Sequence, residues 1–288
     1  MGELREKRFS FRGGDGAALA GYRWGAPGQA KTIVQLAHGM GEHAGRYRSA
    51  LSQVLEAGHV IYANDHRGHG LTATAETIGD FGPGGYDAVV DDLAQLNAVI
   101  RAENPSAKII LLGHSMGSML AQGYVLSHAD QIAGMALSGT TAVDLVAALG
   151  AHPRGLEAVN EPFEPGRTSF DWLSRDDAEV DAYIADPLCG FALKPESMVS
   201  LFSQGGRLAD PTELAKIPKG FPIYIFVGEA DPVNAKGAWL QPLVDRYVAA
   251  GAEVLTDIYP GARHEVLNET NRAEVVANLL RWLNRTFA

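Results

Sequence analysis

Ser115 stands at the centre of a G-x-S-x-G pentapeptide, Gly113-His114-Ser115-Met116-Gly117. The apolar run 108–112 before it predicts a buried strand, and the segment 118–126 after it predicts a helix. In this context the serine hydroxyl projects from a sharp turn, and glycine two residues to either side keeps side chains out of that turn. The pattern predicts a nucleophilic serine. The alternative is an ordinary glycine-rich turn between a strand and a helix.

A serine hydroxyl is a weak nucleophile until a positioned base removes its proton, and histidine has a suitable pKa for this task. His264 follows the strand-like run 253–259, and Asp231 follows the strand-like run 221–227. We expect His264 to act as the base and Asp231 to orient its imidazole. Each residue alone has an ordinary explanation, since Asp231 precedes a proline, Glu229 competes for its role, and His264 is one of 9 histidines. Their order after Ser115 and their common placement behind strands favour a catalytic triad.

Acyl transfer also needs two N–H groups that bind the substrate oxygen as it becomes negatively charged. One donor is expected from Met116, directly after the nucleophile, and the other from a loop after an early strand. His38-Gly39-Met40 follows the apolar run 32–37, so the Met40 N–H is the expected second donor. Gly39 lets this loop approach the turn around Ser115 closely.

The rest of the sequence alternates strand-like and helix-like segments, which favours a mostly parallel sheet flanked by helices. A glycine-rich turn at 13–16 predicts that the first two strands form an antiparallel hairpin. The expected eight strands are 8–11, 18–24, 32–37, 59–64, 108–112, 132–138, 221–227 and 253–259. The expected helices are 47–57, 86–103, 118–126, 236–250 and 269–287. The fold class is therefore α/β, with the triad at the carboxyl ends of the strands, where such sheets bind ligands.

The alternation stops between residues 140 and 217, where prolines separate short pieces whose apolar residues have no strand period. We interpret 140–217 as a helical cap, or lid, inserted over the carboxyl edge of the sheet. Residues 1–139 and 218–288 then form the core. The alternative is a few extra core helices with no gating role.

The composition is that of a folded protein, with 46% hydrophobic and 20% charged residues among 288. A net charge of −10 makes nucleic acid a poor partner. No stretch approaches the roughly 20 apolar residues of a membrane span, and the N-terminus has no secretory signal. Cys189 is the only cysteine, which fits a reducing compartment. We therefore expect a cytoplasmic protein, with monomer and homodimer both open.

Two other motifs suggest different chemistry, and both are weak. Residues 39–44 match a loose dinucleotide-binding fingerprint, with Asp65 near the position that binds a ribose, but the preceding strand is not the first. Several histidines and acidic residues near the early strands suggest a metal site, yet none has the spacing of a zinc site. We expect these histidines to hydrogen-bond the backbone of the loops that brace the site, with no metal and no cofactor. The set is His38, Glu42, His43, Asp65, His66 and His69.

Several stretches resemble the monoacylglycerol lipase and lysophospholipase branch of the α/β-hydrolases, which is serine aminopeptidase S33-like. The most specific are His-Gly-Met-Gly-Glu-His at 38–43 and Asp-His-Arg-Gly-His-Gly at 65–70. The other matching stretches are 46–47, 113–117, 186–188 and 264–269, so the resemblance runs from about residue 35 to 269. Thr72 stands where this family usually has serine, which we expect to be a harmless exchange.

The resemblance implies an α/β-hydrolase fold with a cap, and a serine hydrolase that cleaves esters of single-acyl-chain lipids through an acyl-enzyme. In such enzymes, residues matching Glu42, Arg46 and the cap tyrosine Tyr183 can line a polar head-group pocket. Gly39 and His114 are expected at the same substrate site.

The sequence is also compatible with other functions. The sequence after His264 lacks the second histidine that some monoacylglycerol lipases place beside the glycerol, which argues against strict glycerol-ester specificity. A short-chain carboxylesterase is one alternative, and a proline-iminopeptidase-like amidase is another, since Glu157, Glu161 and Glu164 could bind an amine. A non-catalytic module that holds a small apolar ligand is disfavoured because no triad residue is missing. The expected partner is a small ester or lipid, and the cap could also contact lipid surfaces.

Overall fold

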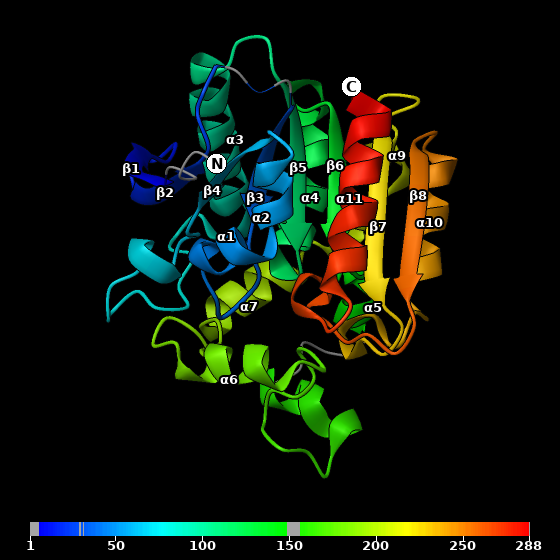
Figure 1. The fold of residues 1–288 in the computed structure, drawn as a ribbon. Helices are drawn as coiled ribbons and strands as arrows, with labels where there is room; N and C mark the ends of the chain where they lie inside the picture. Colours follow the sequence, from blue (N-terminus) through cyan, green and yellow to red (C-terminus); the bar gives the residue numbers. More distant parts are fainter. Residues whose placement is uncertain (1–5, 29, 31, 149–155, 288) are drawn as a thin grey trace.

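The computed structural model describes residues 6–28, 30, 32–148 and 156–287. Its centre is an 8-stranded sheet with the order β1-β2-β4-β3-β5-β6-β7-β8 (Figure 1). β1 pairs antiparallel with β2, and β2 with β4, whereas the other neighbours are parallel. The strands are β1 (Glu6–Arg12), β2 (Ala18–Trp24), β3 (Thr32–Ala37), β4 (Val60–Asn64), β5 (Lys108–His114), β6 (Gly134–Ser138), β7 (Pro222–Gly228) and β8 (Glu253–Tyr259). The predicted mostly parallel sheet is confirmed.

Helices and short 3₁₀ turns connect the strands. The α-helices are α1 (Tyr47–Ala50), α2 (Ser52–Glu56), α3 (Gly85–Glu103), α4 (Met116–His128), α5 (Val143–Ala148), α6 (Asp177–Ala185), α7 (Pro195–Phe202), α8 (Gly205–Ala209), α9 (Pro211–Leu214), α10 (Leu240–Ala249) and α11 (Arg272–Phe287). The 3₁₀ segments are η1 (Ala44–Arg46), η2 (Gly70–Thr72), η3 (Ala129–Gln131), η4 (Leu156–Phe163), η5 (Pro232–Asn234) and η6 (Val266–Asn268). Within the described ranges, no helix is both long and apolar enough to cross a membrane.

Different helices cover the two faces of the sheet, because alternate residues of its central strands point to opposite faces. Ile33 on β3 and Ile109 on β5 pack in one core with α3, α4 and α10. Their neighbours Val34 and Ile110 pack in a second core with α1, α2 and α11. In Figure 1, α11 lies in front of the sheet, and α4 and α10 lie behind it. Burial on both faces explains why these strands are continuous apolar runs in the sequence.

Two helices differ from the prediction because of local backbone geometry. The helix expected over 47–57 is divided at Leu51, where φ is −102° and ψ is 18°. The helix expected over 236–250 begins only at Leu240, because Ala235 and the residue after it have φ of 53° and 54°. A left-handed backbone conformation is not part of a right-handed helix, so the chain turns there before α10 starts.

The region predicted as a cap packs in two different ways. Trp172, Leu173 and Tyr183 form a small apolar cluster of their own, and α6 lies beyond the carboxyl ends of the strands (Figure 1). By contrast, Leu201 on α7 and Leu208 on α8 belong to the core that contains α3 and α4. The region predicted as a cap thus has an outer part around α6 and an inner part, α7 and α8, that packs in the core. The boundaries of the cap at residues 140 and 217 stay a prediction.

Candidate active site

Ser115 occupies a strained turn between β5 and α4. Its φ of 52° and ψ of −121° are unusual for a residue with a side chain, and such strain persists only where the surroundings enforce it. The Ser115 N–H donates to the Ser138 carbonyl at 2.9 Å, which ties the turn to the end of β6. A Cβ on Gly113 would collide with the Gly117 carbonyl, and one on Gly117 would collide with the Ala37 carbonyl. Both glycines of the motif are therefore required by packing.

His264 and Asp231 form a buried pair at the carboxyl ends of β8 and β7. His264 Nδ1 lies 3.0 Å from each carboxylate oxygen of Asp231, and the two side chains are 2% and 0% exposed. This contact places the imidazole proton on Nδ1, which donates to the carboxylate. His264 Nε2 is buried and has no protein partner, so its lone pair is available to accept a proton.

The imidazole of His264 contacts two other rings. The His114 ring, next to the nucleophile in sequence, lies 4.9 Å away, and the Trp172 ring lies 5.0 Å away. Trp172 also lines the same cavity as Ser115. The sequence identified Trp172 only as one of several apolar residues of the insertion, so its contact with His264, the predicted base, is a finding of the structure.

The pKa of His264 reflects two opposing influences. Burial lowers it, whereas the Asp231 carboxylate, with smaller contributions from Glu265 and Glu42, raises it above the ordinary value of a histidine. The negative surroundings therefore favour the imidazolium that forms when a base takes a proton from serine. This is the electrostatic behaviour that a catalytic base requires.

Hydrogen bonds fix both peptide planes of the predicted oxyanion loop. The Gly39 N–H donates to Glu42 Oε1 at 2.6 Å, and His38 Nδ1 lies 2.8 Å from the Gly39 carbonyl oxygen. Because His38 Nε2 accepts from the His66 N–H at 3.0 Å, the His38 proton is on Nδ1 and donates to that carbonyl. In a trans peptide the N–H points opposite to the carbonyl, so the Met40 N–H is directed away from His38.

The two predicted oxyanion donors lie at Ser115, the predicted nucleophile. Met40, Met116 and Ser115 line one cavity. Gly39 approaches so closely that a Cβ added to it would lie 3.3 Å from the Ser115 Cβ. Among the hydrogen bonds of the described residues, the Met40 and Met116 N–H groups donate to no protein acceptor. Both are therefore available to a developing oxyanion.

The histidines of the two glycine-rich loops form a neutral, buried cluster. The rings of His38 and His66 are 4.1 Å apart, and that of His69 is 5.2 Å from His38. Burial lowers the pKa of His66 to about 3 and that of His69 to about 4. As expected, His38 and His69 hydrogen-bond the backbone, the latter to the Arg67 carbonyl at 2.8 Å. The ring nitrogens of His66 have no protein partner, so that expectation is wrong for His66.

The residues predicted for a head-group pocket lie together, and their charged groups pair with one another or with Glu265. Arg46 donates to Glu42 at 2.6 Å and to both oxygens of Glu265 at 2.7 and 2.8 Å. The Tyr183 ring lies 4.8 Å from the Arg46 guanidinium, and the Tyr47 hydroxyl donates to Glu42 at 2.6 Å. Burial raises the pKa of Glu42, whereas Arg46 overcomes burial and lowers the pKa of Glu265 to about 2. Sequence reasoning missed Glu265, whose only signal was its position after His264.

A mostly apolar cavity of about 310 Å³ opens at Ser115. Gly39, Glu42, Arg46, His114 and Tyr183 are not among the described residues that line it, so their contact with substrate stays a prediction. The lining residues are Met40, Ser115, Met116, Met119, Val146, Val159, Glu161, Pro162, Trp172, Met198, Phe202, Pro232, Val233 and Trp239.

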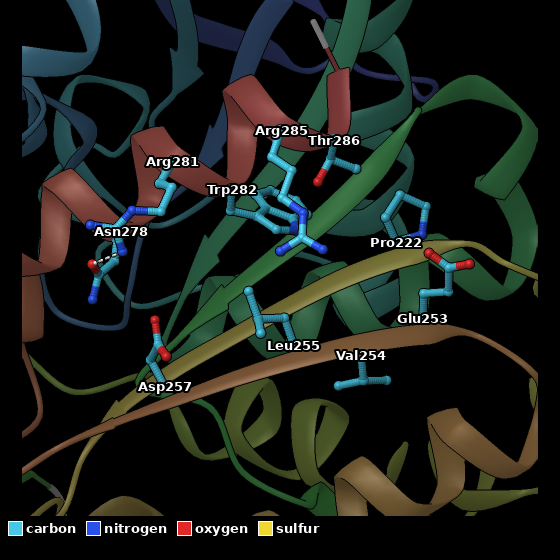
Figure 2. Close-up of a pocket in the computed structure, with 10 residues that line it drawn as sticks. All are labelled: Pro222, Glu253, Val254, Leu255, Asp257, Asn278, Arg281, Trp282, Arg285 and Thr286. Atoms are coloured by element: carbon cyan, nitrogen blue, oxygen red, sulfur yellow. Dashed lines mark hydrogen bonds between the residues drawn. The ribbon is translucent and has the colours of Figure 1, made fainter.

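A larger hollow of about 590 Å³ lies elsewhere, between β8 and α11 (Figure 2). Figure 2 shows Arg281, Trp282 and Arg285 of α11 above Leu255 and Asp257 of the edge strand. No triad residue or oxyanion donor lines this hollow. The smaller cavity, which is lined by the predicted nucleophile Ser115, is therefore the candidate active site.

Known proteins share this arrangement of sequence and fold. The family model described as "Serine aminopeptidase, S33" matches residues 28–271. The chain belongs to this family. Among relatives of this S33 hydrolase, a monoacylglycerol lipase of Mycolicibacterium smegmatis is 30% identical over 285 residues, which is 95% of each chain. A monoglyceride lipase of Homo sapiens is 29% identical over 88% of this chain and 82% of its own.

A solved esterase structure is also similar to this chain in fold and sequence. The crystal structure of a thermostable carboxyl esterase from Bacillus coagulans, in complex with glycerol, has a TM-score of 0.86 and 29% identity, covering 99% of this chain and 100% of that one. The predicted α/β-hydrolase fold and the resemblance to the monoacylglycerol lipase branch are confirmed. This S33 hydrolase is a serine hydrolase of carboxylic esters.

Proposed function

We propose that this S33 hydrolase cleaves esters of single-acyl-chain lipids, of the monoacylglycerol or lysophospholipid type, with Ser115, Asp231 and His264 as its catalytic triad. The observation that carries the proposal is the mostly apolar cavity at Ser115, beside the buried His264–Asp231 pair. The apolar walls suit an acyl chain, and the relatives are named monoacylglycerol and monoglyceride lipases.

The proposed reaction proceeds through an acyl-enzyme. Ser115 Oγ attacks the ester carbonyl while His264 Nε2 takes its proton, and Asp231 stabilises the imidazolium that results. The carbonyl oxygen becomes negative and accepts hydrogen bonds from the Met40 and Met116 N–H groups. His264 then gives the proton to the leaving alcohol, and the C–O bond of the ester breaks. A water molecule, activated by the same imidazole, releases the fatty acid and restores the serine. These steps require no cofactor.

The acyl chain is proposed to lie among the apolar residues between α4, α7 and the segment around Trp172. Burying each CH₂ there contributes roughly 0.8 kcal/mol, so the enzyme should distinguish chain lengths. We propose that residues 140–217 act as a cap over this cavity. Ile184 and Val199 of this region are 47% and 63% exposed, which supports a peripheral contact of the cap with lipid surfaces.

The alcohol side of the substrate is proposed to face the oxyanion loop. Glu42, Arg46 and Tyr183 lie around this loop, with Gly39 and His114 closer to the nucleophile. Arg46 and Glu42 are paired with each other. They would therefore contact a head group through polar atoms outside this pair or through a water molecule. We further propose a cytoplasmic protein, because a single cysteine fits a reducing compartment. Monomer and homodimer are both compatible with this proposal.

Substrate profiling tests the acyl-chain proposal. With p-nitrophenyl esters from acetyl to palmitoyl, kcat/KM should rise with chain length up to a limit set by the cavity. A flat profile, or activity on acetyl esters alone, would indicate a short-chain carboxylesterase instead. Monoacylglycerols and lysophospholipids in the same assay identify the head group.

Covalent labelling tests the nucleophile separately. A fluorophosphonate probe should label the native protein and fail to label Ser115→Ala. An unlabelled native protein would favour a non-catalytic module that binds an apolar ligand.

A second candidate is a proline-iminopeptidase-like amidase, because Glu161 lines the cavity and a carboxylate there could bind a substrate amine. Glu164 lies in the same segment, and the side chain of Glu157 is outside the described part of the structure. Hydrolysis of aminoacyl-β-naphthylamides faster than of acyl esters would favour this candidate.

A further inference from the structure

Three side chains of kinds that can bind Zn²⁺ meet where the loop after β3 contacts the segment after α6. A ring nitrogen of His43, a carboxylate oxygen of Asp186 and the sulfur of Cys189 all lie within 4.8 Å of one another. His43 Nε2 is 3.0 Å from Asp186 Oδ2. Imidazole, carboxylate and thiolate are ligands of Zn²⁺, with bond lengths of about 2.0–2.3 Å. Side-chain rotations that bring the donors about 1 Å closer would therefore surround a single ion.

We propose that His43, Asp186 and Cys189 form a binding site for a divalent cation of borderline softness, with Zn²⁺ as the expected ion and water as its fourth ligand. The three side chains are partly exposed, so an ion can reach them from solvent. The site is separate from the triad and does not depend on the proposed function. No spacing motif could reveal it, because 143 residues separate His43 from Asp186.

The two segments that carry the ligands are already held together. The Gly190 N–H donates to the Gly41 carbonyl at 2.9 Å, and the Tyr183 hydroxyl donates to the same carbonyl at 2.8 Å. Asp186 Oδ1 accepts from the Leu188 N–H at 2.8 Å, which leaves Oδ2 directed at His43. The carboxylate is thus oriented before any ion binds, as metal ligands usually are.

The electrostatic surroundings favour a cation. The carboxylates of Glu42, Asp186 and Glu265 and the guanidinium of Arg46 are the charged groups that act on the Cys189 side chain. Three carboxylates and one guanidinium leave this region with a net negative charge. A divalent cation compensates this charge and stabilises the thiolate directly.

Binding has a defined proton balance. The Gly45 N–H lies 3.2 Å from His43 Nδ1, so the imidazole proton is on Nε2 and is donated to Asp186. When the cation bonds to Nε2, this proton moves to Nδ1, and the long contact from Gly45 is lost. The Cys189 thiol gives up its proton to solvent as the metal–sulfur bond forms. One proton is therefore released for each ion bound, with no redox change.

A bound ion would tie the segment after α6 to the loop that carries Met40. Such a link adds stability to the folded state, because the unfolded chain does not hold the three ligands together. The expected consequence is a rise in thermal stability that depends on the concentration of the ion.

Cobalt(II) absorption and thermal unfolding test the site without reference to activity. Titration of the metal-free native protein with Co²⁺ should produce a thiolate-to-cobalt charge-transfer band, and Zn²⁺ should abolish it by competition. Zn²⁺ should also raise Tm by several degrees. Cys189→Ser is the deciding variant, since it removes one ligand and leaves the His43–Asp186 pair intact. It should lose the band and weaken Zn²⁺ binding at least about tenfold.

The controls separate this site from scattered surface binding. His128→Gln removes another partly exposed histidine, which contacts Gln131, and should leave the band and the Tm shift unchanged. Absence of the band in the native protein, or the same Tm shift in Cys189→Ser, would overturn the proposal. Loss of the shift in His128→Gln would also overturn it. Ester hydrolysis by the metal-free protein reports on the proposed function alone.

Discussion

Arg46 and Glu265 form a bidentate ion pair, with nitrogen–oxygen distances of 2.7 and 2.8 Å, although 219 residues separate them in sequence. Arg46 ends the 3₁₀ turn that follows the proposed oxyanion loop, and Glu265 directly follows His264, the proposed base. The pair therefore joins the loop of Met40, the proposed oxyanion donor, to the loop of His264, the proposed base. Glu42 extends this link, since it accepts from both Arg46 and the Gly39 N–H.

Breaking this pair should destabilise the protein. Glu265→Gln leaves the buried guanidinium with one carboxylate partner fewer, and we expect the free energy of unfolding to fall by about 3 kcal/mol. Urea denaturation measures the loss. Arg46→Met should cost a similar amount, and the double variant should cost less than the sum by on the order of 1–3 kcal/mol. Strictly additive losses would contradict a direct energetic link between the two loops.

The tautomer of His38 provides a second prediction. His38→Phe keeps an aromatic ring in place but removes the donor to Gly39 and the acceptor for the His66 N–H. The peptide before Met40 then loses its anchor, so we expect kcat for a good ester to fall about 10²–10³-fold with little change in KM. Steady-state kinetics and a thermal unfolding curve of the same variant provide the measurement. A variant that loses stability but keeps kcat would show that His38 only fills space.

The fold could be predicted, and the proposed triad could be identified, because their signals in the sequence are local. Ser115, Asp231 and His264 each follow an apolar strand, and parallel strands bring their carboxyl ends to one edge of the sheet. The glycines at 113 and 117 predict a tight turn in which these two positions have no room for a side chain. The fold followed from the alternation of strands and helices. The two largest errors in helix bounds lie where backbone dihedrals divide a helix at Leu51 and delay the start of α10 after Ala235.

The supporting contacts could not be predicted because they join distant segments. Glu265 looks like any loop glutamate until the structure places it against Arg46. Trp172 looks like an ordinary apolar residue of the insertion until its ring is found 5.0 Å from that of His264. His66 had the sequence features of a hydrogen-bonded loop histidine. Its ring is nevertheless buried, and its ring nitrogens have no hydrogen-bond partner in the protein.

The raised pKa of His264 predicts the acid limb of the pH–rate profile. Because the base must be neutral to accept the serine proton, kcat/KM should fall as the pH drops through a value above the ordinary 6.5 or so of histidine. Asp231→Asn removes the main influence that raises this pKa, so the acid limb should move to lower pH while kcat falls about 10⁴-fold. Initial rates from about pH 5 to 9 measure both effects. An acid limb that does not move in Asp231→Asn would contradict the proposed pairing.

The raised pKa of His264 also affects the stability of the fold. The stabilisation that it provides falls as the pH rises, whereas kcat/KM increases. A folded pKa above the unfolded one means that the native state binds the proton more tightly. The stabilisation from His264 is thus fully present below the unfolded pKa and is lost as the pH rises through the folded pKa. In Asp231→Asn, the free energy of unfolding should change less between those two pH values than in the native protein. Urea denaturation at pH values on either side of the transition measures the difference, and an unchanged dependence would count against the coupling.

Adjacent residues on α7 allow a matched test of the acyl cavity. Met198 lines the cavity at Ser115, whereas Val199 is 63% exposed. Met198→Trp should fill part of the space, so kcat/KM for palmitoyl esters should fall by at least about tenfold, which corresponds to about two CH₂ groups that can no longer be buried. Butyryl esters should be hydrolysed almost as before. Val199→Trp adds the same ring on the solvent side and should leave the chain-length profile unchanged. Equal losses for short and long esters in Met198→Trp would mean that the acyl chain lies elsewhere.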